Sequence, residues 1–284
     1  MTANPKIKKK DNHSLLAKYA AAPHIVWAVL FIVAPLIFVV YYAFTNASGA
    51  ISFSNLAEFF TPEYLKIFLR SVRLSLISTL ICLFIGYPVA YFISRTKPST
   101  QKLLILLIML PMWMNFLIRT YAIMVLIQDT GIIGSFLARF GVESLGLIGT
   151  ETAVVLGMVY DYLPYMILPI YSVLTKMDYK LVEAASDLGC NGFNVLRKVI
   201  IPLSLSGIVS GVTMVLVPSI STFYISQKLG SPDTFLIGDI IEQQYASYNY
   251  NMAAALSFVL MLILIAGLAI ANKYTDKEEG GMMP

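Results

Sequence analysis

Six apolar stretches, each near the ~20 residues that a helix needs to cross a ~30 Å hydrocarbon core, constrain this chain more than any other feature. Polar segments of uneven length separate them, and no soluble domain or internal repeat stands out. We therefore expect one all-α transmembrane domain over residues 24–271, preceded by a basic segment, 1–23, and followed by a tail, 272–284. The six expected spans are 24–45, 72–94, 103–127, 152–173, 201–222 and 251–271.

The composition agrees with a multi-span membrane protein. Hydrophobic residues make up 58% of the chain and charged residues 13%, with a mean hydropathy of +0.75. Soluble domains average about 25% charged residues, so an ordinary soluble core is excluded and the lipid bilayer is the expected surrounding. A nucleic-acid partner is excluded as well, because no basic patch is interleaved with aromatic residues.

The cysteines and histidines of the chain give little support for catalysis or metal binding. The two cysteines, Cys82 and Cys190, are over 100 residues apart, and the two histidines, His13 and His24, stand near the N-terminus. No pair of a nucleophile and a base is visible, and no cluster has the spacing of metal ligands. We expect a non-catalytic protein without a metal or a cofactor.

The distribution of lysine and arginine predicts the orientation in the membrane. Segments on one side, namely 1–23, 95–102, 174–200 and 272–284, hold 14 of the 20 Lys and Arg residues. Because cytoplasmic loops carry an excess of these residues, both termini are expected in the cytoplasm. On the opposite side, residues 235–245 have the apolar periodicity of a short amphipathic helix.

The cytoplasmic segment 178–202 reads as a helix, a turn and a second helix. Asp178 is a plausible N-cap, Gly189 ends the first helix as glycine commonly does, and Gly192 follows in the turn. Pro202 then opens the fifth span. From the residues alone, an ordinary amphipathic cytoplasmic helix explains this segment as well as a docking element does.

The spacing within this segment resembles a family. Glu183-Ala184-Ala185, three residues, Gly189, nine residues and then Val199-Ile200-Ile201-Pro202 are similar to the EAA loop of ABC-importer permeases. The family pattern ends in Ile-x-Leu-Pro, so Val199 and Ile201 are conservative departures. The resemblance implies a six-span bundle of the type I (MetI-like) kind, with a cytoplasmic coupling helix between spans four and five.

In that family the coupling helix docks on a nucleotide-binding subunit. The resemblance implies a cytoplasmic ATPase dimer, a second and distinct permease subunit and an extracytoplasmic solute-binding protein as partners in the bacterial cytoplasmic membrane. This chain lacks the G-x-x-x-x-G-K-[ST] motif, so ATP hydrolysis must belong to another chain. The residues expected to couple transport to the ATPase are Glu183, Ala184, Ala185, Asp187, Gly189 and Pro202.

A narrower resemblance concerns the solute. Residues 111–121, residues 160–171 with Pro164 and Pro169, and Leu236-Ile237-Gly238 are similar to spermidine/putrescine permeases. This resemblance implies import of polyamines. Related permeases for other solutes share parts of these motifs, so a different small solute is the alternative.

Two ionisable residues lie well inside the expected spans. Arg119 and Asp161 are roughly 12 and 14 Å from the outer ends of spans three and four, at ~1.5 Å per residue. Charges at such depth are costly and mark functional candidates, but an ion pair that joins the two spans explains them equally well. In the functional reading, Asp161 contacts an ammonium group and nearby aromatic rings add cation–π contacts. The candidate pathway residues are Trp113, Asn115, Arg119, Tyr121, Tyr160, Asp161, Tyr162 and Tyr165.

A secondary transporter or channel is a less favoured alternative. It needs coupling-ion ligands, a filter motif or inverted repeats of broken helices, and none stands out. Gly207 and Gly211 form a G-x-x-x-G in span five, which favours close packing against another helix without indicating which one.

Overall fold

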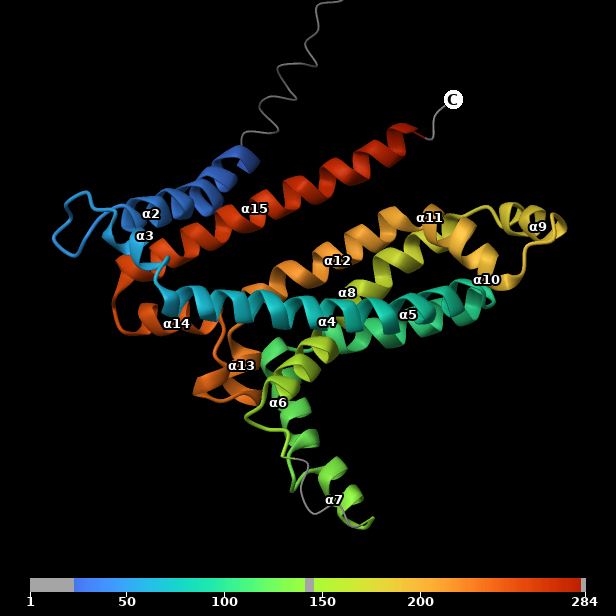
Figure 1. Cartoon of the computed structure of the whole chain (residues 1–284), viewed down its shortest axis with the longest axis horizontal. Coiled ribbons are helices and arrows are strands. Elements are labelled where there is room, and N and C mark those ends of the chain that lie inside the picture. The colour runs from blue at the N-terminus through green and yellow to red at the C-terminus, as the bar shows by residue number, and fades with distance from the viewer. Residues whose placement is uncertain (1–22, 141–145, 282–284) are drawn as a thin grey trace, which may run out of the picture.

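A computed structural model describes residues 23–140 and 146–281 (Figure 1). Within these residues the regular elements are helices, and the one β-type feature is an isolated bridge between Thr45 and Ile51. The basic N-terminal segment, apart from Pro23, lies outside the described residues. The described part is all helical, as the apolar stretches predict.

Three long helices form the core of the bundle. They are α4 (Pro62–Ser94), α8 (Glu151–Lys176) and α12 (Leu205–Ile220), which pack on one another. α8 lies in the middle and buries large side chains such as Met158, Met166 and Ile170. The central helix therefore depends on tight packing on several sides.

The glycines of span five allow its close approach to α8. A Cβ atom added to Gly211 would lie 2.8 Å from Met166 Sδ, and one added to Gly207 would lie 3.1 Å from Ile170 Cα. Real Cβ atoms are essentially never closer than 3.0 Å to a neighbour, so Gly211 has no room for a larger side chain without a shift. The structure thus identifies α8 as the partner of the G-x-x-x-G face, which the sequence left open.

A second layer consists of two helices beside the core. The first span runs through η1 (Val29–Val33) and α2 (Ala34–Ala43), and it lies alongside α15 (Tyr250–Gly281) (Figure 1). Asn251 Nδ2 joins the two by donating to the carbonyl oxygens of Tyr42 and Thr45 at 3.1 and 2.8 Å. α2 leaves most of its apolar side chains exposed, so its burial is incomplete in the single chain.

Five helices in the described part are long and apolar enough to cross a membrane, and a sixth span is possible if a bent pair counts as one. The bent pair joins residues 192–203 to α12 at an angle of 68°. Ser204 lies at the bend, where its hydroxyl is 2.9 Å from Tyr87 Oη and 3.1 Å from the carbonyl oxygen of Ile201. The five candidate spans other than the bent pair are Pro23–Ala43, Pro62–Ser94, Phe116–Phe136, Glu151–Lys176 and Tyr250–Ala269.

Several helix boundaries differ from those expected, and α15 continues to Gly281, ten residues beyond the end of the expected sixth span. α4 begins at Pro62 rather than at residue 72, because proline suits the first turn of a helix and the polar residues that follow do not stop it. The stretch 103–127 divides into α5 (Pro98–Trp113) and α6 (Phe116–Ile127). Asn115 starts the second helix by accepting a hydrogen bond from Leu117 N at 2.8 Å.

Short helices mark the two ends of the bundle (Figure 1). At one end lie α9 (Lys180–Asp187), α10 (Gly192–Val195) and the turn between α4 and α5. At the other lie α3 (Ser54–Glu58), α13 (Tyr224–Leu229) and α14 (Ile237–Ala246), with the start of α15. α14 is the amphipathic helix expected over residues 235–245, and α7 (Ile132–Ala138) follows α6.

Candidate functional site

The loop between α8 and α12 folds as a helix, a turn and a second helix. Asp178 Oδ1 accepts a hydrogen bond from Lys180 N at 3.0 Å, although the N-cap position of α9 falls on Tyr179, one residue later than expected. Gly189 follows the helix with φ of +85°, a left-handed conformation that L-residues rarely adopt. Asn191 then caps α10 by accepting from Asn194 N at 2.9 Å. Each turn of this loop therefore has a local cause in its sequence.

The exposed surface of α9 combines apolar and acidic side chains. Val182 is buried against the core, whereas Leu181 and Leu188 are 48% and 86% exposed. A helix face that exposes leucines beside carboxylates, outside a membrane span, has the character of a docking surface. The remaining exposed residues of this surface include Glu183, Ala184 and Asp187.

The second half of the loop leads into span five through irregular helix. A π-helical turn, η2 (Leu196–Ile200), precedes α11 (Ile201–Leu203), which contains Pro202. The 68° bend at Ser204 comes two residues after this proline. Pro202 thus lies before the bend rather than at the start of a straight span.

Arg119 and Asp161 form a buried ion pair. Arg119 Nε donates to Asp161 Oδ1 at 2.5 Å, and the two side chains are 4% and 0% exposed. The other carboxylate oxygen accepts from Thr120 Oγ1 at 2.9 Å, and Arg119 Nη1 lies 3.3 Å from the carbonyl oxygen of Pro111. The pair therefore links α6 to α8, and both charges are hydrogen-bonded.

The aromatic pathway candidates fall into two groups. Trp113, Tyr121 and Tyr160 are 68%, 53% and 38% exposed, while Tyr162 is 6% exposed and packs within the bundle. Tyr165 is half-buried, with its ring centroid 6.4 Å from that of Tyr162, and Asn115 is exposed at the start of α6. In the single chain, the exposed aromatic residues are the ones that a solute or another subunit can reach.

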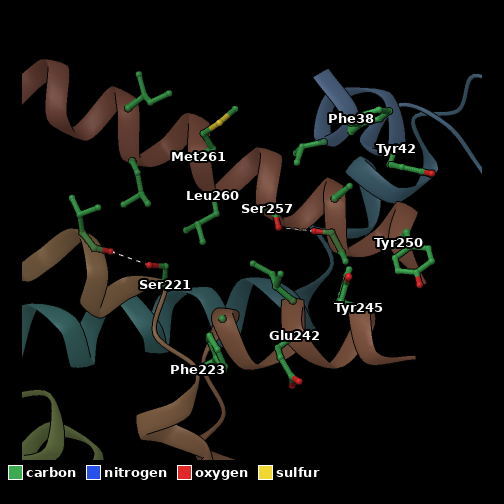
Figure 2. A pocket seen from close by; sticks show the side chains of 18 of the residues that line it. Phe38, Tyr42, Ser221, Phe223, Glu242, Tyr245, Tyr250, Ser257, Leu260 and Met261 are labelled. Carbon is green, nitrogen blue, oxygen red and sulfur yellow. Dashed lines mark hydrogen bonds between the residues drawn. The ribbon is translucent and has the colours of Figure 1, made fainter. Parts of the chain in front are cut away.

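A large groove, which we call the α15 groove, was not foreseen from the sequence. It has a volume of about 890 Å³ and is lined by α2, α12, α14 and α15 (Figure 2). Leu260 and Met261 belong to its apolar wall, and Tyr42, Tyr245 and Tyr250 gather at one end (Figure 2). No sequence signal points to the groove, because four separate elements form it.

Asp239 is a second feature that sequence reasoning missed. It is 1% exposed at the start of α14, where Oδ2 accepts from Leu236 N at 2.6 Å. Among the described residues Oδ1 has no hydrogen-bond partner. Burial raises the pKa of this carboxyl to about 6.

Comparison with known proteins defines the class. The chain belongs to the family of binding-protein-dependent transport system inner membrane components, whose model matches residues 19–275. The EAA-type spacing indicated this family, and the match confirms the prediction of an ABC-importer permease.

Two similar proteins have descriptions that specify a solute, which the family description does not. The chain is 37% identical to the spermidine/putrescine transport system permease protein PotB of Haemophilus influenzae, over 89% of this chain and 92% of that protein. It is 33% identical to PotB of Escherichia coli, over 84% and 90% respectively. A solved bacterial alginate ABC transporter, in complex with alginate pentasaccharide-bound periplasmic protein, has the same fold, with a TM-score of 0.78 at 14% identity over 96% of this chain and 98% of that chain.

Proposed function

We propose that this chain is a permease subunit of a polyamine importer of the ATP-binding-cassette class, and that its solutes are spermidine and putrescine. The observation that carries the proposal is the 37% identity, along nearly the whole chain, to a spermidine/putrescine permease. The exposed rings of Trp113, Tyr121 and Tyr160 support it, because aromatic faces attract ammonium groups by about 0.5–2 kcal/mol without holding them tightly.

The coupling site in this proposal is the loop 178–202. A separate cytoplasmic ATPase dimer binds the exposed surface of α9, and closure of that dimer moves the loop relative to the bundle. The exposed leucines and carboxylates of α9 support a partner there. The end of the bundle that carries α9 also carries basic residues of the predicted cytoplasmic segments, which supports cytoplasmic termini. These residues belong to α9, η2, the end of α8, and the turn between α4 and α5 with the start of α5, and they are Arg95, Lys97, Lys102, Lys176, Lys180, Arg197 and Lys198.

An extracytoplasmic solute-binding protein delivers the polyamine at the opposite end, where α3, α13 and α14 lie (Figure 1). The family description, which specifies transport that depends on a binding protein, supports this partner. We assign Arg119 and Asp161 to the structural pairing of α6 with α8, because both are buried and hydrogen-bonded. In this proposal, the exposed aromatic residues contact the solute.

A second permease subunit completes the pathway, and we place it in the α15 groove. α2 exposes most of its apolar side chains and contacts the rest of the chain chiefly through α15. A helix of this kind gains burial when another subunit packs against it, since close packing drives helix association in lipid. The groove beside it is mainly apolar, so a membrane helix of the second subunit suits it.

Replacing Ala254 by tryptophan is expected to weaken association with the second permease about fivefold or more. Ala254 lines the α15 groove, and overpacking of a fitted contact typically costs about 1–3 kcal/mol. The measurement is the amount of second permease that co-purifies with the variant. Ala266→Trp is the matched control, because Ala266 is exposed on the same helix outside the groove. Equal association in both variants would remove the groove as the interface.

Competition for uptake tests the solute. In vesicles that contain the full importer, excess unlabelled spermidine or putrescine is expected to suppress ATP-dependent uptake of labelled spermidine, and a dicarboxylate such as glutarate is expected to have no effect. Cationic amines and aromatic rings attract each other, whereas a dianion gains nothing from these rings. Absence of spermidine uptake, or equal competition by glutarate, would refute the polyamine assignment.

A further inference from the structure

Arg95 lies where the core helix α4 ends, beside the start of the coupling helix. Its guanidinium carbon is 4.6 Å from the ring centroid of Tyr179 and 5.1 Å from that of Tyr91. Tyr179 is the N-cap residue of α9, and Tyr91 belongs to the last turn of α4. A single cation therefore connects the bundle to the N-cap residue of the coupling helix.

The environment of the Arg95 guanidinium group is unusual for a buried charge. Within the described part of the chain, Nε and Nη2 of Arg95 are buried and have no hydrogen-bond partner. Buried guanidinium groups are ordinarily paired with acceptors, because unsatisfied donors are costly. Here the charge lies against two aromatic rings, whose electron-rich faces attract cations.

A contact of this type differs mechanically from a salt bridge. A bidentate ion pair fixes the distance and angle of two hydrogen bonds, whereas a cation over a ring has no directional bond to break. The contact therefore survives small sliding or tilting of one partner. A contact of this kind suits an element that moves with the ATPase and stays attached to the bundle.

Besides its packing against α10 and η2 within the same loop, the coupling helix has few attachments to the bundle. Val182 is its buried residue, and Ala185 is partly buried against the same core. Leu181 and Leu188 are exposed, so they contribute little to holding the helix on the bundle. The contact between Arg95 and Tyr179 is thus a main connection between α4 and α9.

We infer that Arg95 is a positioning residue for energy coupling, which holds the coupling helix against α4 through the ring of Tyr179. The inference rests on the proposed function, in which α9 receives the motion of the ATPase. Arg95 touches neither solute nor nucleotide in this account. Its role is to transmit displacement of α9 to the inner end of α4, and from there to the bundle.

Variants at the two residues test this inference in the complete importer reconstituted with its ATPase and its binding protein. Tyr179→Leu and Arg95→Gln are expected to lower the uptake achieved per ATP hydrolysed by roughly threefold to thirtyfold, the range that corresponds to loss of one cation–π contact. Tyr179→Phe keeps the ring and is expected to restore the ratio to that of the unchanged importer. Lys97→Gln, which removes an exposed charge nearby, is the control for charge alone.

Two further readouts separate positioning from folding. The thermal midpoint is expected to fall by no more than a few degrees in Tyr179→Leu and Arg95→Gln, and the amount of co-purified ATPase is expected to stay unchanged. If uptake and ATP hydrolysis fall together with assembly, or if Tyr179→Phe is as impaired as Tyr179→Leu, the inference is wrong. Stimulation of ATP hydrolysis by the loaded binding protein is recorded as well. It reports coupling for whichever solute is carried, so a failed polyamine assignment is distinguishable from a failed role of Arg95.

Discussion

Replacing Gly189 by valine will lower ATP-driven uptake by roughly fivefold to thirtyfold, whereas the same replacement at Gly192 will leave uptake close to that of the unchanged protein. Gly189 has φ of +85°, and an L-residue in the left-handed region costs about 1–2 kcal/mol, with β-branched residues worst. No atom lies within 4 Å of a Cβ built on either glycine, so the two variants differ in backbone strain and not in crowding.

The measurement compares uptake, ATP hydrolysis and co-purified ATPase for Gly189→Val and Gly192→Val. Strain at Gly189 is expected to displace α9 from the orientation in which the ATPase receives it, so uptake falls while the permease still inserts in the membrane. Gly189→Asn should recover part of the activity, because asparagine tolerates the left-handed conformation. Normal transport by Gly189→Val would show that the geometry of this turn does not matter for coupling.

Replacing Asp161 by asparagine will destabilise the permease by about 3–5 kcal/mol, the usual cost of leaving one member of a buried ion pair without its partner. Arg119 would then hold a positive charge that is 4% exposed inside the bundle, beside an amide in place of the carboxylate. Thr120 would lose a charged acceptor at the same time. We expect little folded subunit and little assembled importer from this variant.

The double variant Arg119→Leu with Asp161→Leu separates the two possible roles of this pair. Replacing both charges by apolar residues of similar volume is often neutral in buried sites, so the double variant should recover folding and assembly. Yield of monodisperse importer in detergent and uptake in vesicles are the two measurements. If the double variant assembles fully but imports no polyamine, Asp161 serves the pathway, and our assignment of a structural pair fails.

The helical class follows from the sequence because apolar stretches of this length have few other solutions. The described part holds five candidate spans, or six if the bent pair counts as one, where the sequence predicts six. The boundaries depend on finer effects. Residues 62–71 carry Lys66 and Arg70 and were expected in a loop, yet they continue α4. Lys66 is exposed, and Arg70 donates to the carbonyl oxygens of Asp233 and Phe235, so neither charge stops the helix. The break at Met114 and Asn115 lies within a largely apolar stretch, so hydropathy alone does not reveal it.

Some features of the candidate sites were predictable from the sequence, and others were not. The turn at Gly189 was predictable, because glycine after a short amphipathic helix is a local signal. The nearness of Arg119 to Asp161 followed from their similar depths on consecutive spans. The α15 groove and the contact between Arg95 and Tyr179 join segments far apart in the chain. Tertiary packing alone brings those together, so no periodicity or motif could indicate them.

The central claim is that this permease receives its driving motion from a separate ATPase at α9, and site-specific cross-linking tests it most directly. A single cysteine is placed at Ser186, exposed on α9, or at Ser247, exposed at the opposite end, in a chain where Cys190 is serine. Cys82 is buried and stays unchanged. We predict a covalent adduct with the ATPase subunit from Ser186→Cys and none from Ser247→Cys. An adduct from Ser247→Cys alone, or from neither position in an importer that transports, would contradict the account.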